Sequence, residues 1–325
     1  MTLRVSVVVP TFNRPDLLDR CLNALVNQEM EPWSFEIVVA DDAASEATCH
    51  RVEHWAGAAC ERGTFVCYVR TCGRRGPAAA RNTGWRAARG EIIAFTDDDC
   101  VPLPGWLAAG LSAFTGTVAA VDGRVVMPLP AEPTDYEKNA AGLEQAEFVT
   151  ANCFYRRDVL DAVGGFDEQF RAAWREDSDL FFRVLDLKQP VGHAPDAIVI
   201  HPIRPGRWGV SIGQQQKTIY NALLYRKHPE RYRERIQAAP PWRYYRIVGA
   251  LATAFGAGLL GRRRTSLVAA GVWAVMTGRF CVERIAETSR RPAHVAEMIV
   301  TSAIIPPLAV YWRIRGAIRY RVLFV

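Results

Sequence analysis

Short apolar runs alternate with stretches of helical periodicity along the first hundred positions of the chain. Four runs of five or six residues are rich in Val, Ile and Phe, and they occupy Val5–Val9, Glu36–Ala40, Thr64–Val69 and Glu91–Thr96. Residues 14–28 and 78–88, which precede the second and fourth runs, have the spacing of amphipathic helices. Strands that alternate with helices indicate βαβ units and a mostly parallel sheet that is covered on both faces.

The second hundred positions continue this pattern less regularly. The apolar spacing predicts strands near residues 117–127 and over residues 148–155, with a loop over residues 128–133. It then predicts a helix from about residue 176 and a last strand over residues 197–200.

Charged residues follow several of the predicted strands. Asp41-Asp42 ends the second run, Asp97-Asp98-Asp99 ends the fourth, and a Gly- and Arg-rich loop at residues 73–77 follows the third. Because parallel strands present their carboxyl ends at one sheet edge, these groups are expected to converge on one crevice. Three adjacent carboxylates repel one another and favour a hard cation such as Mg²⁺ or Mn²⁺. Asp41-Asp42 alone is equally consistent with a turn or a helix cap.

Six segments follow one another in a distinctive order: Val5–Arg14, Val38–Asp42, Ala80–Gly84, Phe95–Asp99 with Pro104, Gly164–Glu168 and Glu176–Leu180. Their order and spacing resemble those of the family 2 glycosyltransferases. The resemblance extends over residues 3–202 and implies an α/β GT-A fold. In that fold a Rossmann-like nucleotide-binding half and an acceptor half surround a mixed, mostly parallel sheet. A dinucleotide or P-loop site is disfavoured, since neither glycine signature occurs.

The resemblance also implies a nucleotide-sugar site. Asp42 would contact the nucleotide base, and Pro10 and Phe12 would line the same pocket. Five further residues are candidates to hold the ribose, a metal-bound water and the two phosphates: Arg74, Arg75, Arg81, Asp97 and Asp98. Family habit favours UDP as the nucleotide.

The resemblance assigns a metal site and a catalytic base as well. Asp99, Asp97 and His201 would hold Mg²⁺ or Mn²⁺, which neutralises the diphosphate leaving group. Asp177 would take the proton of an acceptor hydroxyl in a single displacement that inverts the anomeric configuration.

Trp174 and Glu176 would contact the acceptor. Three alternative readings stay open. Glu176-Asp177 is also typical of a helix N-terminus. His201 is also consistent with a buried core histidine, and Trp174 is equally consistent with a core aromatic residue.

The charge of the chain is divided unevenly. The whole chain of 325 residues carries 40 Lys+Arg and 34 Asp+Glu, a net of +6. Residues 1–202 carry 19 Lys+Arg and 29 Asp+Glu, which gives 19 − 29 = −10. Residues 203–325 carry 21 Lys+Arg and 5 Asp+Glu, which gives 21 − 5 = +16. A strongly basic C-terminal third is expected to meet an anionic partner.

Three uncharged stretches interrupt this basic region, at residues 247–261, 265–278 and 298–312. At 14 or 15 residues each, they are expected to be too short to cross a hydrocarbon core of about 30 Å. Pro306-Pro307 is expected to break or kink the third. Arg262-Arg263-Arg264 lies between the first two, so helices attached to one leaflet of an anionic membrane are favoured over crossing helices or a soluble helical cap.

These observations predict a catalytic domain at residues 1–202, a basic helical linker at 203–240 and a helical, membrane-associated region at 241–325. The predicted function is an inverting, metal-dependent transfer of a sugar from a nucleotide donor to a hydroxyl of a lipid-linked or growing-glycan acceptor. The predicted location is the cytoplasmic face of the cell membrane, because the chain starts without a signal peptide and its eight cysteines show no Cys-x-x-Cys pair. A nucleotidyltransferase and a non-catalytic sugar-nucleotide-binding scaffold are the alternatives. Nucleic acid is not an expected partner, since no nucleic-acid-binding module is recognisable.

Overall fold

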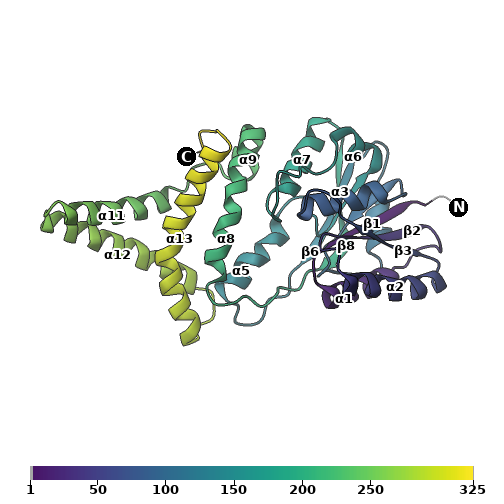
Figure 1. Ribbon diagram of the computed structural model, residues 1–325, viewed down its shortest axis with the longest axis horizontal. Helices are drawn as coiled ribbons and strands as arrows, with labels where there is room; N and C mark the ends of the chain where they lie inside the picture. Colours follow the sequence, from purple (N-terminus) through teal and green to yellow (C-terminus); the bar gives the residue numbers. More distant parts are fainter. Residues whose placement is uncertain (1–2, 325) are drawn as a thin grey trace. The chain divides into compact units, whose positions relative to one another are not determined.

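A computed structural model describes residues 3–324, and the chain divides into two compact units. The first unit comprises residues 1–128 and 142–203, and the second comprises residues 129–141 and 204–325. The second unit therefore includes a short segment, residues 129–141, that interrupts the first unit in sequence. The sequence pattern gave no indication of this grouping. Figure 1 labels many of the elements of both units.

The first unit is an α/β structure built on a single mixed sheet. Within the described residues the sheet has eight strands in the order β3-β2-β1-β4-β7-β6-β8-β5. The strands are β1 (Val5–Thr11), β2 (Phe35–Asp41), β3 (Phe65–Arg70), β4 (Ile92–Phe95), β5 (Val101–Pro102), β6 (Ala120–Val126), β7 (Cys153–Arg156) and β8 (Val191–Ile200). The first four strands are mutually parallel, β7 runs antiparallel to both β4 and β6, and β6 is parallel to β8. The carboxyl ends of β1, β2, β4, β6 and β8 therefore lie at one edge, as a mostly parallel sheet requires.

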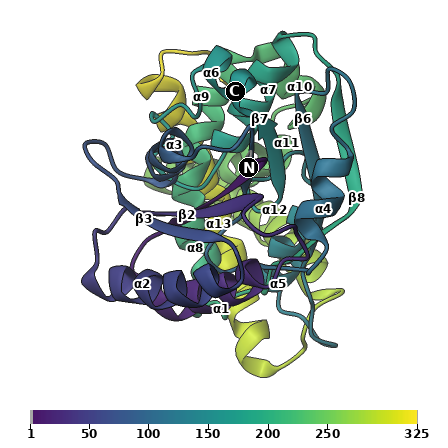
Figure 2. The same cartoon turned by 90° about the vertical axis from the view of Figure 1, so that its right-hand side faces the viewer.

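Helices cover both faces of the sheet. They are α1 (Pro15–Val26), α2 (Glu46–Glu61), α3 (Pro77–Ala87), α4 (Trp106–Ser112), α6 (Arg157–Val163) and α7 (Glu176–Asp186), with a short 3₁₀ turn at Gly142–Gln145. Figure 2 shows α1 and α2 on one face and α3 on the opposite face. Every residue of β1 and β2 is buried, as expected for strands that are covered on both sides. The apolar spacing of residues 14–28 predicted α1 correctly, since its buried residues include Leu18, Leu22 and Leu25.

The predicted strand over residues 148–155 is the main error in this unit. Phe148 has φ of 50°, and the Asn152 amide donates to the Val149 carbonyl, so residues 148–152 form a turn and β7 begins at Cys153. The apolar pattern is genuine, because Phe148 is buried and stacks on Phe181 with ring centroids 4.0 Å apart. The burial comes from packing against a helix and not from strand pairing.

A buried asparagine joins the strands of the second half of the sheet. The Asn152 side chain accepts a hydrogen bond from Trp106 Nε1 at 2.8 Å and donates to the carbonyls of Arg124 and Ala197 at 2.9 and 2.8 Å. The register of β6 and β8 shifts between Gly123 and Arg124. A Cβ at Gly123 would lie 2.4 Å from the Ala197 carbonyl oxygen, so this bulge requires glycine.

The second unit is helical. It contains α5 (Asp135–Ala141), α8 (Val210–Gln214), a 3₁₀ turn at Gln215–Thr218, α9 (Ile219–Lys227), α10 (Pro229–Arg235), α11 (Trp242–Leu259), α12 (Arg263–Ile285) and α13 (Pro292–Arg319). The guanidinium of Arg284 on α12 binds both carboxylate oxygens of Asp135 on α5, at 3.2 and 2.6 Å, and donates to Thr301 and Ser302 on α13. This one side chain therefore connects three helices.

The expected helix lengths are too short for the second and third stretches, and Pro306-Pro307 does not break the third. The helices run to 18, 23 and 28 residues, because charged residues extend each one beyond its uncharged stretch. By length and composition alone, α12 and α13 are long and apolar enough to cross a membrane. In their most apolar stretches, 22% and 33% of the residues are buried in the structure. Pro306 and Pro307 lie inside α13 without ending it. The two missing amide donors are tolerated where Ile305 and Pro306 are buried against neighbouring helices.

We predict that Asn152→Ala destabilises the first unit by about 2–4 kcal/mol, because it leaves the buried Trp106 indole N–H without its acceptor and opens a cavity. Guanidinium unfolding followed by circular dichroism measures this loss. Asn27→Ala, an exposed asparagine of the same unit, serves as the matched control and should stay within about 0.5 kcal/mol of wild type. Equal stability of the two variants would contradict the role given to Asn152.

Candidate active site

The candidate site lies at the edge of the sheet where β1, β2, β4 and β8 end. Asp42 follows β2, Asp97–Asp99 follow β4, and His201 follows β8. The His201 amide donates to the Val126 carbonyl at the end of β6, which fixes the histidine at this edge. The predicted convergence of charged residues on the carboxyl edge is therefore present in the described structure.

The three adjacent aspartates have three different environments. Asp98 is buried and accepts hydrogen bonds from Thr11 Oγ1 at 2.8 Å and from Arg14 at 3.2 Å. Burial raises the pKa of Asp98 to about 6, even though Arg14 and Thr11 act in the opposite direction. Both carboxylate oxygens of Asp98 are thus engaged within the protein, and this side chain connects β4 to the start of α1.

Asp97 turns towards a buried arginine. Its Oδ1 accepts a hydrogen bond from Arg81 Nη2 at 2.7 Å. Burial acts to raise the pKa of the Asp97 carboxyl, but Arg81 and then His201 outweigh burial and hold it below its ordinary value. The ionised form of Asp97 is therefore favoured next to the buried Arg81 guanidinium.

Arg81 forms a bridge across the site. Its side chain is 3% exposed, and Nη1 donates to Glu176 Oε1 at 3.0 Å while Nη2 binds Asp97. Burial alone would lower the pKa of Arg81, but the two carboxylates reverse this and raise it. The sequence predicted a phosphate-binding role for Arg81. In the structure, two of its nitrogen atoms bind carboxylates, those of Asp97 after β4 and Glu176 on α7.

Glu176 and Asp177 begin α7 but differ in burial. Glu176 is 2% exposed, and burial together with the Asp177 charge raises its pKa to about 7, against the effect of Arg81. Asp177 is half-buried, and its Oδ1 accepts hydrogen bonds from the Ser178 amide at 2.6 Å and the Ser178 hydroxyl at 3.3 Å. Asp177 is thus the more accessible carboxylate at the helix N-terminus, where the dipole favours negative charge.

Trp174 precedes this pair and is 37% exposed. The Arg175 guanidinium lies 4.9 Å from the centre of its ring. This exposure disagrees with the alternative interpretation of Trp174 as a core aromatic residue.

The two aspartates at the end of β2 have separate roles. Asp41 accepts hydrogen bonds from the amides of Ala43 and Ser45 and from the Tyr68 hydroxyl, so it stabilises the turn into α2. Asp42 Oδ2 accepts from the Gly76 amide at 2.9 Å, and Oδ1 has no hydrogen-bond partner among the described residues. Burial raises the pKa of Asp42. Asp41 is therefore the residue with a structural role in the turn, whereas Asp42 has one buried carboxylate oxygen that can still accept a hydrogen bond from a ligand.

The loop that carries Arg74 and Arg75 reaches Asp42 through Gly76. Gly76 has φ of 120°, and a Cβ there would lie 3.0 Å from the Arg171 carbonyl oxygen, so the loop requires glycine at this point. Both arginines are exposed. At the end of β1, Pro10 is buried and Phe12 is 50% exposed, which leaves the Phe12 ring accessible to a ligand.

A group with metal-ligand character lies at the end of β4 and β8. Ligand atoms of Asp99, Cys100 and His201 lie within 4.8 Å of one another, and His201 Nε2 is 3.7 Å from Asp99 Oδ1. His201 Nδ1 is buried and has no hydrogen-bond partner within residues 3–324. A carboxylate and an imidazole suit Mn²⁺, whereas the soft sulfur of buried Cys100 does not suit Mg²⁺. Asp97, predicted as a ligand, is not in this group.

Sequence reasoning missed two features of the site. One is Cys100 beside the carboxylates, which carried no signal beyond its position after Asp99. The other is Asn82, whose side chain donates to the Phe166 carbonyl at 2.8 Å and to Glu168 at 3.0 Å and accepts from the Phe166 amide. Asn82 therefore connects α3, which also carries Arg81, to the turn that precedes α7. The sequence shows the order of these two motifs along the chain but not that they are in contact.

We predict that the free energy of unfolding falls as pH rises from about 4.5 to about 7, because Glu176 stays protonated when folded but ionises when unfolded. Asp98 contributes in the same direction and Asp97 in the opposite one. Glu176→Gln should remove on the order of 3 kcal/mol from this pH dependence. Denaturant unfolding at pH 5 and 7.5 measures the effect. Exposed Glu61→Gln should keep the full dependence, and an identical response of the two variants would refute the assignment.

Two family models match the chain. The model described as glycosyl transferase family 2 matches residues 6–166, and that described as glycosyl transferase family group 2 matches residues 134–313. Glycosyltransferase AglE of Haloferax volcanii is 30% identical over 211 residues, which covers 62% of this chain and 67% of AglE. The pre-mycofactocin glycosyltransferase of Mycobacterium tuberculosis is 29% identical over 216 residues. That match covers 62% of this chain and only 43% of the relative.

Solved structures share the fold. Mannosyltransferase PcManGT from Pyrobaculum calidifontis, in complex with GDP-Man and Mn²⁺, aligns with a TM-score of 0.57 at 21% identity and covers 99% of this chain and 88% of its own. S. aureus TarS 1-349, in complex with UDP-GlcNAc, aligns with a TM-score of 0.51 at 16% identity, over 99% of this chain and 93% of its own.

The sheet order, the carboxylates at its edge, the family models and the similarity to AglE agree with one another. The chain therefore belongs to the family 2 glycosyltransferases and has their GT-A fold.

Proposed function

We propose that the protein is an inverting, metal-dependent glycosyltransferase that moves a sugar from a nucleotide donor to a hydroxyl of a lipid-linked or growing-glycan acceptor. The observation that carries this proposal is the Arg81 bridge, which holds the Asp97 end of β4 beside the Glu176-Asp177 start of α7. A group that binds the donor diphosphate and a group that activates the acceptor must lie on either side of the reacting carbon. The bridge brings candidates for both to one sheet edge.

The donor would bind at the ends of β1, β2 and β4. Asp42 Oδ1 is a buried acceptor that suits an N–H group of a nucleotide base, and the exposed ring of Phe12 can pack against the base beside Pro10. Arg74 and Arg75 lie on an exposed loop and can reach phosphate oxygens. Asp97 is proposed to face the ribose. The related folds hold GDP-Man in PcManGT and UDP-GlcNAc in TarS, and UDP is the nucleotide we propose to test first.

Asp99 and His201 would hold the metal ion, with Asp97 close by, and Mn²⁺ or Mg²⁺ is proposed. The fit rests on the 3.7 Å distance between Asp99 Oδ1 and His201 Nε2, and on His201 Nδ1, which has no hydrogen-bond partner in the described part of the chain. When bound, a divalent cation neutralises the charge that develops on the leaving diphosphate.

Asp177 would act as the catalytic base. It is half-buried at the N-terminus of α7, and its Oδ1 is held by Ser178. It would accept the proton of the acceptor hydroxyl as that oxygen forms its bond to the anomeric carbon and the bond to the diphosphate breaks on the opposite face. A single displacement of this kind inverts the configuration. A protonated Glu176 next to it would avoid a second negative charge and can donate a hydrogen bond to the acceptor. Exposed Trp174 would pack on a sugar face.

We assign the chemistry to residues 1–202, a basic linker to 203–240 and membrane attachment to 241–325. The α11–α12 hairpin exposes large apolar side chains to an extent that is unusual for a soluble surface, and six of them are two-thirds exposed or more: Phe255, Leu259, Leu260, Leu267, Val268 and Val275. Arg262, Arg263 and Arg264 follow the end of α11. Apolar faces beside arginines suit insertion into one leaflet of an anionic membrane, and we place this attachment on the cytoplasmic face.

We predict that Asp177→Asn reduces sugar transfer by about 10²–10⁴-fold, because the acceptor proton then has no base to receive it. The measurement is product formation over a panel of nucleotide sugars with Mn²⁺, in the presence of a lipid-linked acceptor extract. Asp161→Asn, an exposed aspartate on α6, should keep full activity.

The Asp99→Asn variant tests the proposed metal site separately from the proposed catalytic base. It should raise the Mn²⁺ concentration needed for half-maximal transfer, whereas Asp177→Asn should leave that concentration unchanged. Transfer unaffected by Asp177→Asn would rule out the proposed base. A wild-type chain that binds donors but turns over none would favour the non-catalytic scaffold.

We predict that replacing Leu259, Leu260 and Leu267 together by Gln weakens binding to anionic vesicles by about tenfold or more, because the variant inserts less apolar surface. Flotation of the full chain with vesicles that contain phosphatidylglycerol measures this. A control variant with Leu187→Gln and Val191→Gln removes exposed apolar residues of the first unit and should bind as wild type does. Unchanged flotation of the hairpin variant would argue against attachment through α11 and α12.

A further inference from the structure

Cys100 and His201 lie opposite each other in the sheet, although they are far apart in sequence. Strand β5 pairs with β8 in antiparallel register, with Val101 opposite Ile200. Cys100 precedes Val101 and His201 follows Ile200, so the next position of the ladder places these two residues opposite each other. Opposite residues of an antiparallel pair project their side chains from the same face. The backbone register therefore brings a thiol to the imidazole of the proposed metal site.

The side chains form a compact group of three ligand atoms. A carboxylate oxygen of Asp99, the sulfur of Cys100 and a ring nitrogen of His201 all lie within 4.8 Å of one another. His201 Nε2 is 3.7 Å from Asp99 Oδ1. In a four-coordinate site with metal–ligand bonds of about 2.0–2.3 Å, neighbouring ligand atoms are roughly 3.3–3.8 Å apart. The group is therefore close to the size of a metal site, and small side-chain movements suffice to close it around an ion.

All three side chains are withdrawn from solvent. Cys100 is fully buried, and the side chains of Asp99 and His201 are 4% and 14% exposed. His201 Nδ1 is buried and has no hydrogen-bond partner among residues 3–324. A buried polar atom without a protein partner is commonly explained by an ion or a water molecule. The imidazole beside Cys100 therefore retains the capacity to bind a ligand.

The donor atoms select among divalent ions. Mg²⁺ prefers a shell of oxygen atoms, whereas imidazole and sulfur favour the transition metals. For a given site of nitrogen, oxygen and sulfur ligands, affinity rises from Mn²⁺ to Co²⁺, and Zn²⁺ also binds more tightly than Mn²⁺. One oxygen, one nitrogen and one sulfur atom therefore shift the preference of this site away from Mg²⁺.

The protonation of Cys100 depends on whether a cation is bound. Burial, and then the charges of Asp97 and Asp99, raise the pKa of the Cys100 thiol, so the sulfur is a neutral thiol without a cation. A dication held by Asp99 and His201 offsets those carboxylate charges. Sulfur that coordinates a metal does so as thiolate, and its proton passes to solvent on binding. The neutral thiol of the metal-free protein is therefore compatible with a thiolate ligand in the metal-bound protein.

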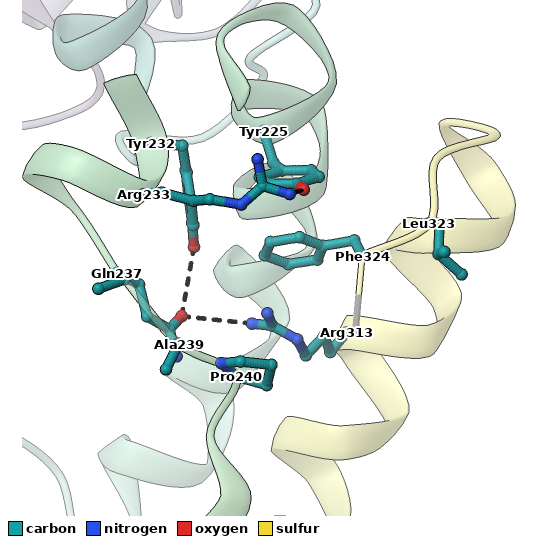
Figure 3. Close-up of a pocket in the computed structure, with 10 residues that line it drawn as sticks. Tyr225, Tyr232, Arg233, Gln237, Ala239, Pro240, Arg313, Leu323 and Phe324 are labelled. Atoms are coloured by element: carbon teal, nitrogen blue, oxygen red, sulfur yellow. Dashed lines mark hydrogen bonds between the residues drawn. The ribbon is translucent and has the colours of Figure 1, made fainter. Parts of the chain in front are cut away.

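The cavity of the second unit offers no comparable group. It has a volume of about 270 Å³, and among the described residues that line it there is no carboxylate, thiol or imidazole. Figure 3 shows the Phe324 ring between Arg233 and Arg313, and it shows Arg313 donating to Gln237. The polar side chains of this cavity thus bind one another around an aromatic ring. The group at the end of β4 and β8 differs because it keeps a buried nitrogen without a protein partner.

We propose that Cys100 is a third protein ligand of the metal site, beside Asp99 and His201, and that it makes the site prefer Mn²⁺, Co²⁺ and Zn²⁺ over Mg²⁺. This inference rests on the metal site proposed above and adds to it one ligand and a selectivity. Three protein ligands leave a position open, as in catalytic zinc sites, where the open position takes water or substrate.

The test is a titration of the full chain with Co²⁺ alone, followed by the charge-transfer absorption of a sulfur–cobalt bond in the near ultraviolet. Four cysteines that are not buried, Cys49, Cys60, Cys67 and Cys72, are replaced by Ser in every sample, so that accessible thiols do not contribute. In this parent chain the absorption should grow to one equivalent of Co²⁺. Cys100→Ser should abolish it and weaken Co²⁺ binding by about tenfold or more. Cys153→Ser, a buried cysteine outside the group, should keep both.

Competition against bound Co²⁺ measures the selectivity. The parent chain should bind Mn²⁺ about tenfold or more tightly than Mg²⁺, and Cys100→Ser should reduce this ratio. An unchanged ratio would overturn the proposed selectivity. The ligand itself would be overturned if Co²⁺ fails to bind, if it binds without the sulfur absorption, or if Cys100→Ser retains that absorption.

A second variant covers a Cys100→Ser chain that fails to fold, which thermal unfolding detects. His201→Gln removes the ligand on the opposite strand, and it should weaken Co²⁺ binding and the sulfur absorption together. Full absorption in this variant would place the sulfur elsewhere and refute the proposal. Sugar transfer is measured separately. A chain that shows the sulfur–cobalt bond but transfers no sugar would refute the enzyme and support this ligand, whereas transfer without the bond would do the reverse.

Discussion

The candidate site depends on one buried guanidinium. Arg81 lies on α3, and it binds Asp97 at the end of β4 and Glu176 at the start of α7. Without its positive charge, Asp97 would lose its charged partner in a poorly solvated crevice that also holds Glu176, and leaving a buried charge unpaired costs several kcal/mol. The bridge therefore fixes the distance between the sheet edge and α7. In the proposed mechanism these two places supply the donor side and the acceptor side of the reaction.

The same constraint explains how several carboxyl groups can share one crevice. Each of the three aspartates after β4 faces a different partner: Asp97 faces Arg81, Asp98 faces Thr11 and Arg14, and Asp99 faces His201. The pKa of Asp97 is held low, whereas burial raises that of Asp98 to about 6. Asp97 and Asp98 are adjacent in sequence and thus differ in the pKa of their carboxyl groups because their surroundings differ.

In the second unit, the helices extend beyond the uncharged stretches that predicted them. α11 begins before its stretch and includes Arg243 and Arg246, whereas α12 and α13 continue past the end of theirs and end near Ala286 and Tyr320. Long charged side chains are compatible with a helix at a membrane surface because their heads can reach water. Internal prolines did not end α13 either, since tertiary packing around Ile305 and Pro306 retains the helix.

The sequence by itself determined the parallel half of the sheet, the helices before β2 and β4, and the edge at which the charged residues gather. Those features follow from local periodicity and from the rule that parallel strands end on the same side. Only the tertiary structure decided the partners of each charge, because they are distant along the chain. Thr11 and Asp98 are 87 positions apart, and Arg81 and Glu176 are 95 apart. It also decided that residues 148–152 form a turn, since burial against Phe181 produces the same apolar pattern as a strand.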